Sequence, residues 1–531
     1  MGGADGRLTT AQKRCIHNTT FVVRAFLALH RRLAPARPAR RVRRTYPTGW
    51  ALALLAWLSV PQASAAAGEP GAKRSAHASK LTLPEVADLN PDPRILEIAL
   101  EARVASVEIA PGRRVDAWTY NGGLPGPLIR LRVGDRLIAR FTNRLPQPTT
   151  VHWHGIRVPI GMDGVPGVSQ PEVKPGETFT YDFVVPDAGL YWYHPHVMSA
   201  AQVGFGLYGA LLVDDPDDGV GIADEQVMVL SDMALETTGT LESPDSGSSI
   251  GMVFGREGDY VLVNGRVRPG LQLRAGSPQR WRIVNAAKSR YFNLYLGGQR
   301  FTIIGGDGGL LEYSVENDLV LLAPGERADV IVVPAGKPGE ELMLQSRLHN
   351  RGYGSVEFRE EPDLIPITLA DLPSVAPPPL PTIRRQLTPL SVEGAVATTI
   401  ELTLGQKSPV EYEFGINGVA FAREKPLRAT VGETHVWTVK NTTKWSHPFH
   451  LHGFFFQLLD DRGAPVRPLA WKDTVDVPLE KSVRLLVRFD ERPGSWMYHC
   501  HILDHADGGL MGMLELVPPG APRPAKPARH H

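Results

Sequence analysis

The chain has 531 residues, which is long enough for about three domains with separate cores. Residues 1–65 hold eleven basic residues and one acidic residue, so the rest of the chain carries 46 basic and 55 acidic residues, a net charge of −9. A mildly acidic body argues against binding to nucleic acid. The 53 glycines and 46 prolines, with runs rich in valine, leucine and aromatic residues, predict an all-β protein.

Residues 1–65 resemble an export leader. An arginine-rich stretch precedes an apolar run at residues 50–60, and Ala63-Ser64-Ala65 follows as a small-residue cleavage site. The run has eleven residues, whereas about 20 are needed to span a bilayer, so no transmembrane anchor is predicted. Arg43-Arg44 before the run resembles a twin-arginine signal, and an ordinary secretory leader is the alternative. We expect an exported protein, either periplasmic or secreted.

An internal repeat follows from about residue 94. Asn-Gly pairs recur after 143 and then 153 residues, and each pair is followed 21 to 24 residues later by another asparagine. The pairs begin at Asn121, Asn264 and Asn417, and the later asparagines are Asn143, Asn285 and Asn441. The intervening patterns, such as LIRLRV and QRWRIV, alternate as strands with one buried face do. Three similar β-sandwich domains are therefore predicted.

The repeat sets the predicted domain boundaries. We place the first domain at residues 66–218, the second at 219–372 and the third at 394–518. A stiff proline-rich linker at residues 373–393 precedes the third domain, and residues 519–531 form a tail.

Histidine clusters occur at matching places in the first and third units. The first unit contains HWHG at residues 152–155 and HPH at 194–196, and the third contains HPFHLHG at 447–453 and HCH at 499–501. The intervals between the two clusters are similar, 40 residues from His154 to His194 and 47 from His452 to His499. The middle unit has Phe292-Asn293-Leu294-Tyr295 at the equivalent place, so it lacks ligands and is expected to bridge the outer units.

The segment HCH is predicted to serve two metal centres. In a strand, Cys500 points to one face and both His499 and His501 to the other. A thiolate suits copper in a His₂Cys site, and the imidazoles suit a second cluster. The only other cysteine, Cys15, lies in the predicted leader, so Cys500 is expected to be a ligand rather than half of a disulfide.

The four motifs in this order resemble the copper signatures of the multicopper oxidases, in the three-domain form of bacterial laccases and copper-efflux oxidases. The resemblance implies three cupredoxin-like Greek-key sandwiches and four coppers: one type 1, one type 2 and a type 3 pair. It implies that the type 1 ligands are His447, Cys500 and His505, and that the type 2 ligands are His152 and His450. The implied type 3 ligands are His154, His194, His196, His452, His499 and His501.

Three further positions follow from the resemblance. The axial position of the type 1 copper falls at Leu510, which cannot coordinate, and Met511 is the alternative if the loop shifts by one residue. Asp163 lies where related enzymes place an acid that delivers protons to oxygen, although Asp163-Gly164 is also a turn signal. A second acid of many bacterial relatives is replaced by Ala506, so Asp504 and Asp507 are the possible substitutes.

The predicted function is a laccase-like oxidase that couples one-electron oxidation of phenols and aromatic amines to four-electron reduction of O₂ to water. A metal oxidase for Cu(I) or Fe(II) is the alternative, disfavoured for Cu(I) because residues 355–415 contain no methionine. A non-enzymatic assembly factor on the same fold would be expected to lack ligands, and none is missing. The expected partners are O₂ and a small reducing substrate; no oligomeric state is predicted.

Overall fold

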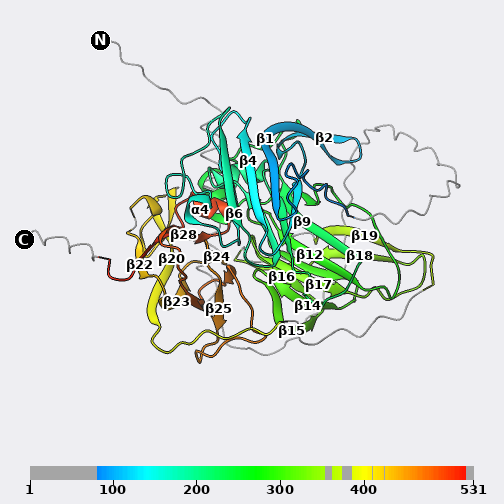
Figure 1. Cartoon of the computed structure of the whole chain (residues 1–531). Coiled ribbons are helices and arrows are strands. Elements are labelled where there is room, and N and C mark those ends of the chain that lie inside the picture. The colour runs from blue at the N-terminus through cyan, green and yellow to red at the C-terminus, as the bar shows by residue number, and fades with distance from the viewer. Residues whose placement is uncertain (1–80, 353–360, 374–384, 410, 424, 522–531) are drawn as a thin grey trace, which may run out of the picture. The chain divides into compact units, whose positions relative to one another are not determined.

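A computed structural model describes residues 81–352, 361–373, 385–409, 411–423 and 425–521, drawn in colour in Figure 1. All of these residues belong to one compact unit, Arg74–His531. The predicted leader and most of the predicted linker and tail lie outside the described residues. Within the described part, no helix has the length and apolar character needed to cross a membrane.

The first sandwich packs a sheet of order β2-β1-β4-β6 against a sheet of order β3-β8-β7-β5. Residues of both sheets, among them Leu100 and Ile129, share one buried core. The strands are β1 (Ile95–Ala110), β2 (Arg113–Tyr120), β3 (Gly126–Arg132), β4 (Arg136–Asn143), β5 (His152–His154), β6 (Thr178–Val184), β7 (Gly189–His194) and β8 (Gly209–Asp214). The 3₁₀ turn η1 (Ile160–Met162) follows β5, and the short helix α2 (Ser199–Gly204) follows β7.

The second sandwich combines the orders β10-β9-β12-β17-β14-β15 and β11-β19-β18-β13-β16 around its own core. Helix α3 (Ser248–Phe254) lies between β9 and β10 in the chain. The strands are β9 (Glu225–Met233), β10 (Tyr260–Val263), β11 (Leu271–Leu273), β12 (Gln279–Asn285), β13 (Phe292–Leu296), β14 (Phe301–Gly306), β15 (Gly309–Asn317), β16 (Val320–Leu322), β17 (Arg327–Val332), β18 (Glu341–Ser346) and β19 (Asp363–Leu369).

The third sandwich combines the orders β21-β20-β23-β27-β25 and β22-β29-β28-β24-β26, and Cys500 belongs to its core. Helix α4 (Leu503–Asp507) follows β28, and the 3₁₀ turn η2 (Phe421–Arg423) follows β21. The strands are β20 (Val396–Ser408), β21 (Glu411–Ile416), β22 (Leu427–Thr430), β23 (Thr434–Asn441), β24 (His447–Leu451), β25 (Phe456–Leu459), β26 (Thr474–Val477), β27 (Ser482–Arg488), β28 (Gly494–Cys500) and β29 (Met511–Val517).

The repeated asparagines perform the same task in each sandwich. Asn121, Asn264 and Asn417 have φ between 49° and 53°, the left-handed geometry of an Asn-Gly hairpin turn. The later asparagine of each pair is buried and donates its amide to two backbone carbonyls, for Asn143 those of Gln147 and Val173, both at 2.8 Å. Asn285 and Asn441 make the equivalent bonds. These side chains satisfy buried backbone carbonyls of the loop that follows the asparagine in each sandwich, and in the first and third sandwiches that loop leads to the first histidine cluster.

The strand directions repeat as well. The first strand of each sandwich pairs in parallel with a later one, as β1 with β4, β9 with β12 and β20 with β23. The other sheet of each sandwich also has one parallel pair, β3 with β8, β11 with β19 and β22 with β29, and the remaining pairs are antiparallel. This is the mixed pairing of a Greek-key sandwich. The predicted fold class, all-β with three cupredoxin-like Greek-key sandwiches, is confirmed; the predicted domain boundaries stay predictions.

Candidate metal centres

Cys500 lies with two histidines at the corners of a triangle of donor atoms. His447 Nδ1 is 3.4 Å from Cys500 Sγ, His505 Nδ1 is 3.7 Å from Sγ, and the two nitrogens are 3.0 Å apart. Strand β24 supplies His447, β28 supplies Cys500 and α4 supplies His505. All three side chains are fully buried. Donors of these types at these separations can close around a single metal ion.

Hydrogen bonds on the outer side of the triangle fix which ring nitrogens face inward. His505 Nε2–H donates to the carbonyl oxygen of Val253 in α3 (3.1 Å), and His447 Nε2–H donates to Thr443 Oγ1 (2.7 Å). Burial lowers the pKa of His447 to about 3 and holds that of His505 well below its usual range, so both rings are neutral. Burial also raises the pKa of Cys500, so the thiol keeps its proton until a metal cation binds the sulfur and displaces that proton to solvent.

Eight further histidines meet between the first and third sandwiches. His152 stacks on His452 with ring centroids 3.9 Å apart, and His154 stacks on His450 at 3.8 Å. The two H-x-H segments therefore face each other in opposite directions. The other four members, from the ends of β7 and β28, are His194, His196, His499 and His501.

The donor atoms of these histidines converge in groups of three within 4.8 Å. The groups are His154 with His194 and His501, His196 with His452 and His499, and His152 with His154 and His450. Several buried ring nitrogens have no hydrogen-bond partner among the described residues: His152 Nε2, His154 Nδ1, His194 Nε2, His450 Nε2 and both nitrogens of His501. Buried nitrogens left unpaired cost free energy unless a metal ion occupies the space between them. The residues therefore fit a cluster of metal ions.

Two buried aspartates hold the outer nitrogens of these rings in a nearly two-fold arrangement. His152 Nδ1–H donates to the backbone oxygen of Asp163 (2.7 Å), and His452 Nδ1–H donates to its carboxylate (2.9 Å). In the same way, His450 Nδ1–H donates to the backbone oxygen of Asp473 (2.9 Å), and His154 Nε2–H donates to its carboxylate (3.2 Å). Each aspartate thus bonds one histidine of its own sandwich and one of the other. Both carboxylates touch the outer nitrogens of the rings, which is the position from which a carboxylate can orient a metal-binding histidine; the donor atoms of Asp163, His152 and His452 also lie within 4.8 Å of one another.

The two aspartates differ in charge partner. Asp473 forms a buried ion pair with Arg327, from the second sandwich, at 2.8 Å (Nη1–Oδ1) and 2.5 Å (Nη2–Oδ2). Asp163 has no lysine or arginine partner within the described residues and contacts only His152 and His452. Burial opposes ionisation of Asp163, but these two histidines hold its pKa well below the usual range. Asp473 is therefore held by an arginine of the second sandwich, which has no histidine cluster. Asp163 has no such arginine or lysine beside it among the described residues.

Comparison with known proteins places the chain in a family. Family models described as "Multicopper oxidase" match residues 101–218, 224–353 and 392–519, one for each sandwich. The chain is a multicopper oxidase. Members of this family are copper-dependent oxidoreductases that use O₂ and a reducing substrate, so copper is the metal that the family implies for the donor clusters.

Individual relatives carry names that differ in the substrate they suggest. The oxidase is 31% identical to "Multicopper oxidase MmcO" of Mycobacterium tuberculosis, over 88% of this chain and 94% of that protein. It is 27% identical to a protein named "Laccase" from Bacillus subtilis, over 76% and 90% of the two chains. A solved structure of the Campylobacter jejuni multicopper oxidase, titled a metallo-oxidase, superimposes with a TM-score of 0.73 at 30% identity, covering 82% and 94%.

The two axial candidates lie on different faces of the oxidase's third sandwich. Leu510 is fully buried and packs in the same core cluster as Cys500. Met511 pairs directly with His499 across β28 and β29, and paired residues share a face of the sheet. Met511 therefore points to the side of His499, opposite to Cys500.

The two acids considered in place of Ala506 also separate. Asp504 accepts hydrogen bonds from the backbone N and the Nε of Arg256 at 2.7 and 2.9 Å, so it is held by a fixed cation. Asp507 accepts only from backbone N–H groups of α2, that of Ala200 at 2.9 Å, and burial raises its pKa to about 6. Of the two, Asp507 is the acid without a cation beside it.

A cavity of about 770 Å³, here called the α3 cavity, opens beside α4. Its lining includes three thioethers and several carboxylates: Met198, Met252, Met511, Asp245 and Asp507. His196 of the histidine cluster also borders it. Because α3 supplies both Met252 and the carbonyl that holds His505, the cavity adjoins the cysteine triangle.

Sequence reasoning missed Asp473, Arg327 and two methionines of the α3 cavity, Met198 and Met252. Asp473 is buried and follows the half-buried residues Trp471 and Lys472, and a charged pair directly before the strand TVDV is an available signal. Arg327 lies in the unit that has no ligands, and the two methionines come from distant segments, so no local pattern connects them to the site.

Proposed function

We propose that the oxidase binds four coppers in the arrangement that the motifs imply. The type 1 ligands would be His447, Cys500 and His505, and the type 2 ligands His152 and His450. The type 3 pair would be held by His154, His194 and His501 on one side and by His196, His452 and His499 on the other. The observation that carries this proposal is the convergence of ring nitrogens in threes, which in two of the groups, His154 with His194 and His501 and His152 with His154 and His450, are buried and without a partner among the described residues.

When bound, copper supplies the one-electron redox chemistry that links a donor to O₂. We propose the laccase-like reaction, in which four one-electron oxidations of phenols or aromatic amines reduce one O₂, with four protons, to two waters. Cys500 is bonded through the backbone to His499 and His501, so one strand offers a continuous path between the two centres. The α3 cavity, at about 770 Å³, is wide enough for an aromatic donor beside α4.

Leu510 is proposed to occupy the axial position of the type 1 site. Its burial in the core with Cys500 supports this, and so does the pairing of Met511, the alternative considered above, with His499 on the opposite face. A leucine cannot donate electrons to the metal, and loss of a weak axial thioether raises the reduction potential.

Asp163 is proposed to relay protons to the oxygen site while it orients His452. Its carboxylate is buried, bonds His452 and has no lysine or arginine partner within the described chain, so no fixed positive charge opposes its protonation. Asp473 is unsuited to this task because Arg327 holds it ionised.

Metal analysis with electron paramagnetic resonance tests the copper assignment. Four coppers per chain are expected, one blue, one normal and a spin-coupled silent pair. Cys500→Ser should lose the blue colour and the activity together, and His450→Gln should lose the normal signal. His435→Gln is a matched control, because His435 is equally buried in the third sandwich but bonds only Glu433 (3.0 Å). Saturation at one copper, or a preference for zinc, would contradict the proposal.

Oxidation of Cu(I) is a second candidate function, favoured by the α3 cavity. Thioether side chains are suitable first contacts for Cu(I), and Met198, Met252 and Met511 line one cavity. These methionines lie outside residues 355–415, whose lack of methionine had counted against this donor. The cavity therefore weakens that argument.

Steady-state kinetics of one copper-loaded preparation can distinguish the two donor classes, Cu(I) and organic donors. If Cu(I) docks in the α3 cavity, Met252→Leu and Met511→Leu should raise the KM for Cu(I) about tenfold while the KM for a phenol changes little. Met343→Leu, in β18 of the second sandwich, controls for the loss of a thioether elsewhere. Unchanged Cu(I) kinetics in both variants, with efficient phenol oxidation, would leave the organic donors as the substrate class.

Export to the periplasm or the medium is proposed from the leader sequence at residues 1–65. Cell fractionation with N-terminal sequencing of the active enzyme tests it. Replacing Arg43-Arg44 with two lysines should block export by a twin-arginine route and leave an ordinary secretory route intact.

A further inference from the structure

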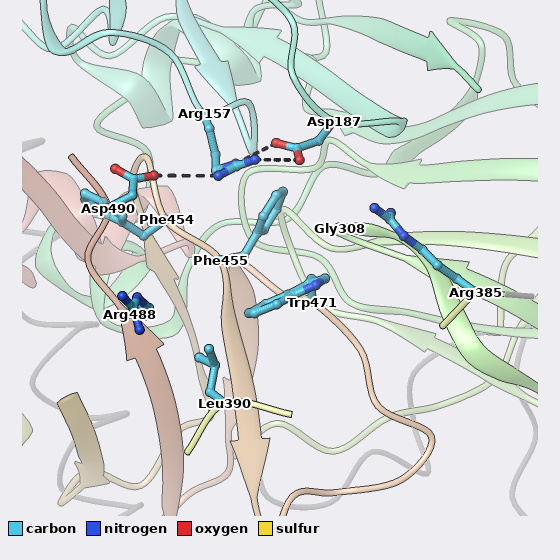
Figure 2. A pocket seen from close by; sticks show the side chains of 10 residues that line it. All are labelled: Arg157, Asp187, Gly308, Arg385, Leu390, Phe454, Phe455, Trp471, Arg488 and Asp490. Atoms are coloured by element: carbon cyan, nitrogen blue, oxygen red, sulfur yellow. Dashed lines mark hydrogen bonds and ion pairs between the residues drawn. The ribbon is translucent and has the colours of Figure 1, made fainter. Parts of the chain in front are cut away.

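A second cavity, here called the junction pocket, lies where the sandwiches meet and has a volume of about 330 Å³ (Figure 2). The first sandwich contributes Arg157 and Asp187, and the second contributes Gly308 from the turn between β14 and β15. The remaining lining residues come from the third sandwich and from the segment before β20. None of the proposed copper ligands borders this pocket, so it is separate from the metal centres.

The pocket lining carries more positive than negative charge. Asp187 accepts two bonds from Arg157, at 2.6 and 2.7 Å, and Asp490 accepts two from Arg492, at 2.7 and 2.8 Å. Both carboxylates that line the pocket are therefore already neutralised.

Two other arginines of the pocket are unpaired. Arg385 and Arg488 are exposed, and within the described chain neither guanidinium forms a hydrogen bond or an ion pair. The pocket thus presents two uncompensated guanidinium groups, the side chains best suited to bind a planar carboxylate with paired hydrogen bonds.

Between these arginines the wall is apolar and aromatic. Figure 2 shows Trp471 and Phe455 with Arg385 and Arg488 on either side of them in that view. Trp471 is held in place by the second sandwich, because Gly308 N–H donates to its carbonyl oxygen (2.9 Å). A Cβ at position 308 would lie 2.4 Å from the Cβ of Trp471, so glycine is required for this close approach. The aromatic surface is therefore a rigid platform on which a flat ring can stack.

We propose that the junction pocket binds a small aromatic carboxylate, with its ring on Trp471 and Phe455 and its carboxylate on Arg488 or Arg385. An inorganic anion would use only the guanidinium groups, and a neutral phenol would use only the aromatic wall. An aromatic acid uses both, and a volume of about 330 Å³ accommodates a ligand of one or two rings. The junction pocket is distinct from the α3 cavity, so it binds the aromatic acid without taking electrons from it.

Isothermal titration of the copper-loaded enzyme with benzoate at low ionic strength tests the proposal. Benzoate has no phenolic hydroxyl group to oxidise, so binding is measured without turnover. Saturable binding of one benzoate per chain is expected, with acetate, inorganic phosphate and benzamide each at least tenfold weaker. The double variant Arg488→Gln with Arg385→Gln should weaken benzoate binding about tenfold, the loss of one charge-assisted contact to the carboxylate.

Two further variants make the result specific. Trp471→Leu should weaken benzoate binding while leaving phosphate binding unchanged, and its blue copper band reports that the fold is intact. Arg132→Gln removes the same charge from an exposed arginine of β3, outside the pocket, and should leave benzoate affinity as it was. Absence of saturation up to about 10 mM benzoate, equal binding by the double arginine variant, or acetate binding as tight as benzoate would each overturn the proposal.

Discussion

Replacing Arg327 with methionine should separate two roles of the ligand-free second sandwich, stability and copper positioning. The guanidinium donates to Leu190 O (3.0 Å), Gly325 O (2.9 Å), Asp307 O (2.8 Å) and both carboxylate oxygens of Asp473. In Arg327→Met the Asp473 carboxylate would retain Thr474 Oγ1 (2.8 Å) and His154 Nε2 (3.2 Å) but no full positive charge. Loss of one member of a buried ion pair costs about 3–5 kcal/mol.

The same change should loosen the outer contacts of two proposed copper ligands. Asp473 bonds His450 through its backbone and His154 through its carboxylate, and loss of such an orienting group costs about 10–100-fold in metal affinity. We therefore expect the normal Cu(II) signal to disappear at chelator concentrations that leave the parent intact. The blue band should persist, because no ligand of the cysteine triangle contacts Asp473 or Arg327 in the described structure.

Arg280→Met is the matched control. Arg280 is also buried in the second sandwich and pairs with Asp329 (2.6 Å) and Asp218 (2.5 Å), but it contacts no histidine. Urea unfolding of the copper-free proteins should show both variants to be destabilised, while chelator competition monitored by electron paramagnetic resonance should distinguish them. If both variants lose type 2 copper equally, or neither does, Arg327 has only a structural role and the reasoning is wrong. Arg327→Lys, which keeps the charge, should restore part of the affinity.

Three further changes address the cysteine triangle and the oxygen site. Asp163→Asn should slow O₂ reduction about 10–100-fold, while the blue copper still forms and is still reduced by the donor. An unchanged turnover number when O₂ is limiting would show that Asp163 does not relay protons. Leu510→Met should lower the potential in a redox titration of the blue band and slow phenol oxidation, and an unmoved potential would mean that another group already occupies the axial position. Burial raises the pKa of Asp476 to about 7, and the charge of its carboxylate acts on Cys500. Deprotonation of Asp476 above that pH should therefore stabilise Cu(II) and lower the reduction potential of the blue copper in a redox titration. Asp476→Asn should lack this pH dependence.

The sequence was sufficient for the fold and for the assembly of the donor residues, because both depend on patterns that repeat along the chain. Alternation in β28 correctly separates Cys500 from His499 and His501, and the asparagine repeat predicts three equivalent turns at Asn121, Asn264 and Asn417. These features are local, so a few neighbouring residues determine them.

The orienting groups could not be found in the same way. Asp163 and Asp473 have equivalent contacts, yet one follows its first histidine by 11 residues and the other by 23, so spacing does not relate them. Their equivalence depends on how the first and third sandwiches face each other, which is a tertiary property. The choice between Leu510 and Met511 likewise required the register of β28 against β29.

The stacking of His152 on His452 and of His154 on His450 also determines when, during synthesis and folding of the chain, the histidine cluster can form. Contacts such as His452 with Asp163 and His154 with Asp473 join residues 289 and 319 positions apart. Pairings over such separations form only after nearly all of the chain is available, and they form late in folding. A chain that stops before β24 can complete its first sandwich and still lack every proposed type 1 ligand and half of the proposed type 2 and type 3 ligands. Copper loading would therefore act as a check on completeness, and truncated products should remain colourless and redox-inert.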